Sequence, residues 1–308
     1  MPAWQSSNRR NIMRLIGTMA AIALLFLLLR EEGWDEIAGA MLKIKLLDLL
    51  WVALLFLISR FAVTARWHIL LRSGGVPIHF KESAGLTFTG LFASNFLPTT
   101  IGGDVVRLAG AMQMGFDRAV CLASIAADRL IGMLGMSMAV PIGLAYSWSM
   151  LQTALGVQSF IALVQKPLGF IRRAFAAFSI WFKKPGALLA SLFFTWVHML
   201  CLFGSIYVFV DDLGTHISFW MIAGLWSLTY FITLLPISIN GYGLQELSFT
   251  YLMSNVAGLT PAVSLTVAIL IRAYFILSSL PGAVFLPSIL AAITEQKITT
   301  PPPHTPAG

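Results

Sequence analysis

Charge is scarce in this sequence of 308 residues, of which only 11% are Asp, Glu, Lys or Arg, against about 25% in soluble domains. Hydrophobic residues make up 58% of the chain, and its mean hydropathy is +0.83. A soluble fold cannot hide that much apolar surface, because its own exterior must be wetted. Disordered chains are excluded too, since they are low in hydrophobicity and high in charge. The sequence predicts an all-α, polytopic integral membrane protein.

Cysteine and histidine are also scarce. The two cysteines, Cys121 and Cys201, lie inside apolar runs and support neither a disulfide framework nor a metal site. The five histidines show no zinc-ligand spacing such as HExxH, and His198 is expected to be a hydrogen-bonded packing residue. No DxD motif, P-loop or Ser-His-Asp constellation is present. The sequence therefore predicts no metal and no cofactor, and it favours a protein that is not an enzyme.

Acidic residues are outnumbered, 13 against 20 Lys and Arg, which gives a net charge of +7. In a soluble protein this excess would indicate nucleic acid as a partner. In a membrane protein, basic residues gather in cytoplasmic loops and contact anionic lipid headgroups. Membrane lipids are therefore the expected partners, and nucleic acid is not.

About six spanning helices are expected, because a span needs about 20 mostly apolar residues. A single membrane domain covers residues 1–293, and the Pro- and Thr-rich tail 294–308 is expected to be disordered. The predicted spans are Leu15–Leu29, Leu46–Ala65, Ala119–Tyr146, Met150–Val164, Ser191–Val210 and Ala262–Ile289.

The segment Gln165–Pro185 mixes basic residues with aromatic and aliphatic ones. This mixture is typical of a helix lying in the headgroup plane. An ordinary basic loop between two spans is the alternative, and both interpretations place the segment in the cytoplasm.

An internal repeat appears in the motif LPxxIxG, which occurs at Leu97 and again 138 positions later at Leu235. Proline removes a backbone donor and glycine relaxes the restriction on φ, so the motif is expected to break a helix. Paired broken segments in corresponding halves indicate a transporter's binding region; a loop between two spans is the alternative. The repeat halves cover about 80–147 and 217–290, and the helix-breaking residues are Pro98, Gly102, Gly103, Pro236, Gly241 and Gly243.

Basic residues orient the chain by the positive-inside rule. They mark Arg9–Arg14, Arg66–Lys81 and Lys166–Lys184 as cytoplasmic, so the N-terminus is expected inside. Ser83–Gly115 must then enter and return to the cytoplasm as a broken or re-entrant hairpin. A second hairpin, Phe219–Val256, is entered from outside, and the two repeats are inverted. The basic residues expected outside, diluted by acidic neighbours, are Arg30, Lys43 and Lys45.

Six charged residues lie in or beside apolar segments, where each costs about 2.5 to 3.5 kcal/mol at a helix centre without a partner. They form either a polar track for a phosphate headgroup or a set of ion pairs that fix helix packing. Arginine suits the first role, because its planar fork binds two phosphate oxygens. Three cations and three anions make the expected local balance neutral. The residues are Asp104, Arg107, Asp128, Arg129, Glu246 and Arg272.

The run GGDVVRLAGAMQMGFDRAVCLASIAADRLIGML, with its GGDxxR turn and DRxxG helix, resembles the first signature of the lysylphosphatidylglycerol synthase transmembrane-region family, also called the flippase-like domain family. LPISINGYGLQE resembles the second signature, and the resemblance covers about Asn11–Ile293. It implies a bacterial or archaeal inner-membrane protein that handles phospholipid or polyprenyl-linked lipid. From the motifs it carries over as site residues Gly102, Gly103, Asp104, Arg107, Asp128, Arg129, Gly241, Gly243 and Glu246.

Two residues depart from the second signature. Asn240 stands where a glycine is usual, and Gln245 stands where the family usually has arginine. The second change removes a cation from the expected site. No residues after Ile293 could fold into the aminoacyl-transferase domain of the family's synthases, so that activity is not expected.

Three functions follow as hypotheses. The first is lipid translocation, with a headgroup moving along the polar track between inverted hairpins. The second is a membrane enzyme, or a partner subunit, in lipid-linked glycan or aminoacyl-lipid synthesis. The third is a scaffold subunit. A homodimer, and a complex with a glycosyltransferase or lipid synthase, are further hypotheses about partners.

Overall fold

The computed structural model describes residues 34–97, 102–148, 183–235 and 240–287, together with positions 16, 19, 23, 25–27, 30 and 238. Within these residues the chain forms helices and no strand, which confirms the predicted all-α fold class. The helices, in order, are α2 (Trp34–Lys43), α3 (Leu46–Ser73), α4 (Phe80–Ser94), α5 (Gly102–Gln113), α6 (Arg118–Ser137), α9 (Pro185–Asp212), α10 (Phe219–Thr233), α11 (Leu244–Asn255), α12 (Pro261–Ser279) and the 3₁₀ helix η1 (Leu280–Val284).

Four helical segments in the described part of the chain are long and apolar enough to cross a membrane: Leu46–Ser73, Arg118–Trp148, Pro185–Asp212 and Pro261–Val284. They fall on four of the six predicted spans, so the chain is a multi-pass membrane protein. Outside the described residues lie the other two predicted spans, apart from isolated positions in the first of them. The same holds for the basic segment Gln165–Pro185 up to residue 182 and for the tail.

Helices α3 and α9 form a long antiparallel pair. At one end, the backbone N–H and Nζ of Lys45 donate to the carboxylate of Asp212 at 2.7 and 2.6 Å. At the other end, Nζ of Lys184 donates to the carbonyl of Ser73. Lys45 precedes α3 and is one of the basic residues expected outside; its hydrogen bond to Asp212 raises the pKa of its ammonium. The cation is thus matched by an acid at the same end of the molecule.

The two predicted hairpins are α4–α5 and α10–α11, and their helices are too short to cross a bilayer. They contain 15, 12, 15 and 12 residues, which corresponds to about 22 and 18 Å at 1.5 Å per residue. The hydrocarbon core is about 30 Å thick. Each hairpin therefore reaches only part of the way, as a re-entrant hairpin does.

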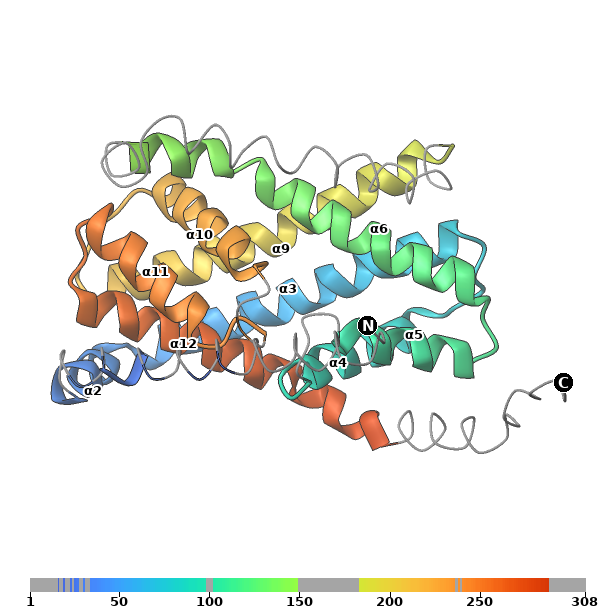
Figure 1. The fold of residues 1–308 in the computed structure, drawn as a ribbon, viewed down its shortest axis with the longest axis horizontal. Coiled ribbons are helices and arrows are strands. Elements are labelled where there is room, and N and C mark those ends of the chain that lie inside the picture. The colour runs from blue at the N-terminus through green and yellow to red at the C-terminus, as the bar shows by residue number, and fades with distance from the viewer. Residues whose placement is uncertain are drawn as a thin grey trace, which may run out of the picture.

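The hairpins lie at opposite ends of the molecule, α4–α5 beside the end of α3 and α10–α11 next to α9 and α12 (Figure 1). Their tips meet. The hydroxyl of Tyr242, in the turn after α10, donates to the carbonyl of Asn95 at 3.3 Å. The Asn95 amide in turn donates to Ser279 Oγ on α12 at 2.9 Å. Contact between segments entering from opposite ends places their broken backbone in the protein interior.

Glycine shapes the two turns in different ways. Gly241 and Gly243 adopt φ of 72° and 73°, a left-handed conformation that glycine accepts without steric cost. Gly102 and Gly103 instead begin α5, where a Cβ on Gly103 would collide with the backbone of Gly90 on α4. The first pair interrupts the helix, and the second lets two helices approach closely. The expected helix breakers Pro98 and Pro236 lie outside the described residues.

The helices recur in the same order in both halves. A 28-residue helix, α3 or α9, precedes a short hairpin, which is followed by a long helix, α6 or α12. The shared order of helices thus also includes the helix before each of the predicted repeat halves, about 80–147 and 217–290. Because α3 and α9 are antiparallel, the two units run in opposite directions (Figure 1).

Labelling with an impermeant thiol reagent tests the orientation. In a protein with Cys121 and Cys201 changed to serine, we expect His216→Cys and Asn255→Cys to react in intact cells, and Lys81→Cys to react only after lysis. All three positions are exposed, so accessibility reports the side of the membrane. Reaction at position 81 in intact cells would reverse the topology. Reaction at 216 with protection at 255 would contradict the second hairpin.

Candidate functional site

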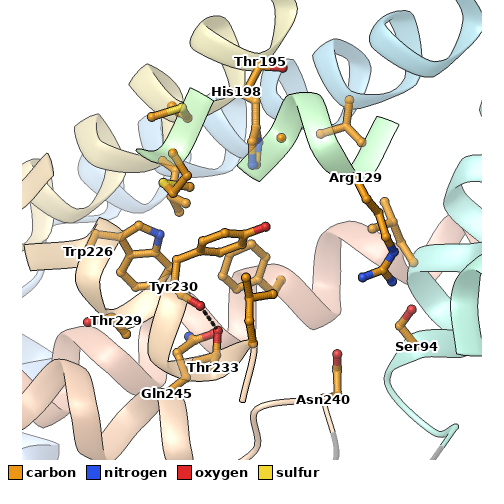
Figure 2. A pocket seen from close by; sticks show the side chains of 18 of the residues that line it. Ser94, Arg129, Thr195, His198, Trp226, Thr229, Tyr230, Thr233, Asn240 and Gln245 are labelled. Atoms are coloured by element: carbon orange, nitrogen blue, oxygen red, sulfur yellow. Dashed lines mark hydrogen bonds between the residues drawn. The ribbon is translucent and has the colours of Figure 1, made fainter. Parts of the chain in front are cut away.

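A cavity of about 360 Å³ lies among α3, α6, α9, α10 and α12, where the hairpin tips meet. Its walls carry many polar side chains, and several of them point into the same space (Figure 2). Among the described residues that line it there are four arginines and no carboxylate. The arginines are Arg60, Arg66, Arg129 and Arg272.

Five charged residues form a continuous network beside this cavity in the first repeat. Asp128 on α6 accepts from Arg66 Nε at 2.6 Å and from both terminal nitrogens of Arg107 at 3.1 and 3.2 Å. Arg107 also donates to Asp104 at 3.2 Å, and Arg129 donates to the other oxygen of Asp104. Asp104 and Arg107 pair on one helical face, and the adjacent Asp128 and Arg129 have different partners, as their spacing predicts.

Local structure holds Arg107 within the network. Its guanidinium stacks on the Trp67 ring with 3.9 Å to the ring centroid, and the Trp67 indole N–H donates to Ser124 Oγ at 3.1 Å. Its side chain passes over Gly90, where a Cβ would lie 2.6 Å from Arg107 Cγ. Two carboxylates and one aromatic ring therefore fix this arginine, which positions the network and does not line the large cavity.

A second cavity, of about 190 Å³, is lined by all five members of the network. Two of them, Arg66 and Arg129, also line the large cavity. These two arginines therefore border both cavities.

The second repeat carries a matching ion pair. Arg272 Nε donates to Glu246 Oε1 at 2.5 Å, as Arg129 donates to Asp104 in the first repeat. Each acid is the third residue of the second hairpin helix, and each arginine is the twelfth residue of the following long helix. A carboxylate in the first turn is stabilised by the helix dipole. The two repeats therefore place equivalent pairs at the two hairpins.

Arg272 is also held by the turn between α10 and α11. Its terminal nitrogen donates to the carbonyl of Gly241 at 3.2 Å, and its guanidinium lies 4.8 Å from the Tyr242 ring centroid. The broken backbone of the turn thus supplies an acceptor inside the protein, as buried irregular backbone at membrane depth requires.

Sequence reasoning missed Arg60. It is only 4% exposed, its Nε donates to Ser278 Oγ at 2.8 Å, and it donates to the Phe275 carbonyl at 3.4 Å. Its guanidinium also lies 5.9 and 5.1 Å from the ring centroids of Phe56 and Phe275. No carboxylate among the described residues pairs with it. The sequence did contain a signal for it, because Arg60 is a charged residue within the predicted apolar span Leu46–Ala65.

The expected place of Arg66 was wrong. It was assigned to the cytoplasmic segment Arg66–Lys81, whereas α3 continues to Ser73 and buries Arg66 to 8% exposure against Asp128. Because Arg66 is paired with Asp128 inside the protein, α3 can continue beyond Ala65, where the apolar run of the sequence ends. The expected neutral balance was therefore wrong as well. With Arg60 and Arg66, five of the described arginines line the two cavities, and three described carboxylates are bonded to them.

His198 is the one histidine among the described residues that line the large cavity. Its Nδ1 lies 2.7 Å from Ser59 Oγ, which confirms the predicted hydrogen bond. Figure 2 shows the imidazole pointing from α9 into the cavity. The residue is therefore part of the cavity wall as well as a packing residue.

Comparison with known families agrees with this architecture. The profile described as "Lysylphosphatidylglycerol synthase TM region" matches residues 14–282, which include both repeats and the cavity. The chain belongs to this family. The resemblance carried by the GGDxxR and DRxxG motifs is thereby confirmed, and the chain is a membrane domain of a family related to lipid handling. No curated protein matches the chain.

Removing the central carboxylate should destabilise the protein. In Asp128→Asn, Arg66 and Arg107 stay buried without their shared counter-charge, which costs about 3 to 5 kcal/mol when one partner of a buried pair is lost. We expect a clear fall in the detergent melting temperature. The control Asp211→Asn breaks an exposed pair with His216 and should melt like the wild type. Equal melting of both variants would show that the network does not stabilise the fold.

Proposed function

We propose that this protein translocates a phosphate-bearing membrane lipid across a bacterial or archaeal inner membrane, with its N-terminus in the cytoplasm. The observation that carries the proposal is the large cavity at the meeting hairpin tips, whose described lining holds four arginines and no carboxylate. Arginine is suited to phosphate, because its planar fork binds two oxygens at once.

The equivalent ion pairs suggest how a headgroup is bound and released. Arg129 and Arg272 both line the cavity, and each is bonded to a carboxylate, Asp104 or Glu246, behind it. A phosphate entering the cavity competes with that carboxylate for the guanidinium. When the phosphate leaves, the internal pair forms again, so the headgroup is bound without being trapped.

The inverted hairpins support alternating access. Transporters built from inverted repeats bind their substrate where discontinuous helices meet, and they expose it to either side by moving one repeat against the other. Here the tips touch through Tyr242 and Asn95, and Asn95 is also bonded to Ser279 on α12. Separation of these contacts on one side at a time would open the cavity to one leaflet and then to the other.

Transport in liposomes tests the proposal. We expect the purified protein to move a fluorescent phosphate-bearing phospholipid between leaflets, and Arg129→Gln and Arg272→Gln each to slow it about tenfold or more, since a hydrogen bond to a charged group contributes about 1.5 to 3 kcal/mol. The conservative Arg272→Lys should recover only part of the rate, because an ammonium lacks the planar fork.

The matched control is Arg118→Gln, which removes an exposed arginine from the same helix as Arg129 and should transport like the wild type. Melting temperatures separate lost transport from lost folding. If the wild-type protein moves no phosphate-bearing lipid, or if folded Arg129→Gln and Arg272→Gln variants transport normally, the proposal is wrong.

A further inference from the structure

Among the described residues, five arginines line the two cavities and three carboxylates are bonded to them, which leaves an excess of two positive charges. All three carboxylates, Asp104, Asp128 and Glu246, are already bonded to arginines. Arg60 has neutral partners in the described structure, a hydroxyl, a carbonyl and two aromatic rings. The site therefore holds more cationic charge than its own acids neutralise. The five arginines are Arg60, Arg66, Arg107, Arg129 and Arg272.

The cavity also contains a neutral donor without an acceptor. The indole Nε1 of Trp226 is buried, with the residue 3% exposed, and has no hydrogen-bond partner among the residues that the structure describes. Trp226 lines the large cavity, and Figure 2 shows it facing the same space as Tyr230 and His198. An indole N–H can only donate, and leaving a buried donor unpaired is unfavourable. A ligand with several acceptor oxygens would satisfy it.

A second buried donor without a partner in the described structure is the amide nitrogen Nε2 of Gln245, which lines the same cavity. The described buried oxygens without a partner, among them Glu246 Oε2 and the hydroxyls of Ser238 and Thr250, belong to residues that do not line the cavity. The unpaired polar groups in the described lining are thus hydrogen-bond donors. Like the arginines, they favour a ligand that carries acceptor oxygens.

We propose that the large cavity is a binding site for a phosphate monoester with two negative charges, in which Arg60 supplies the counter-charge and Trp226 a neutral hydrogen bond. This rests on the proposed function and narrows its substrate class. A monoester carries a charge of about −1.5 to −2 at neutral pH and three acceptor oxygens, which matches a surplus of two cations. A phosphodiester carries one charge fewer, and a zwitterionic or cationic headgroup would leave the surplus uncompensated.

Binding measured apart from transport tests this site. In detergent at pH 8, we expect dioctanoyl phosphatidic acid, a monoester, to bind the wild-type protein at least about tenfold more tightly than dioctanoyl phosphatidylglycerol, a diester. One additional charge-assisted hydrogen bond of about 1.5 kcal/mol or more accounts for that ratio. Glycerol 3-phosphate identifies the source. Binding as tight as that of phosphatidic acid would indicate a soluble phosphate ester as the ligand, and weaker binding a lipid.

Two variants locate the preference within the cavity. Arg60→Gln should bring the affinity for phosphatidic acid down to that for phosphatidylglycerol, and Trp226→Phe should lower it severalfold while keeping the ring. The matched control Arg72→Gln removes an exposed arginine from the same helix and should keep the wild-type preference. Melting temperatures show which variants are folded, and the wild-type comparison of the two lipids does not depend on them.

The outcomes separate this inference from the proposed function. Equal or tighter binding of phosphatidylglycerol by the wild type overturns the monoester site, even if phospholipid is transported. A preference for phosphatidic acid that persists in folded Arg60→Gln removes Arg60 from the site and overturns the proposal as stated. Tight, Arg60-dependent binding of phosphatidic acid without any transport in liposomes leaves the site standing and refutes translocation.

Discussion

The cost of burying charge in an apolar interior governs this structure. An unpaired charge at a helix centre costs about 2.5 to 3.5 kcal/mol, so each buried arginine must find acceptors. Three acids meet this need, and two of them, Asp104 and Glu246, lie in the first turn of a half-length hairpin helix. Only a hairpin that ends inside the protein can present a helix N-terminus to arginines on the long helices. Ion pairing and the re-entrant fold are thus consequences of one constraint.

Much of this arrangement was predictable from residues whose chemistry limits where they occur. The motif LPxxIxG marked both hairpins, since proline and glycine at membrane depth need a broken helix. The six charges in apolar runs marked the ion pairs. Sequence could not separate Gly102 and Gly103, which serve close packing, from Gly241 and Gly243, which serve a turn, because that difference depends on which neighbour each glycine meets.

Arg66 and Trp226 show what sequence reasoning could not reach. A basic residue at the end of an apolar run looks the same whether it enters water or, like Arg66, meets Asp128 62 positions away. A tryptophan in an apolar helix looks like a packing residue, and its unpaired N–H appears only when all neighbours are in place. Both properties are tertiary, since they depend on partners that no local spacing specifies.

The two repeats have diverged in a way that explains the charge of the cavity. Arg107 and Asp128, the sixth residue of α5 and the eleventh of α6, correspond by position to Phe249 and Ile271 in α11 and α12. Phe249 and Ile271 are fully buried in the hydrophobic core. Replacing a buried ion pair by apolar residues is often neutral or stabilising, so packing alone does not require the charged version. In the first repeat, Asp128 also holds Arg66 against the cavity. The charged pair is therefore best understood as the means by which one repeat adds a cation to the central site, while the other repeat uses the same positions to build the core.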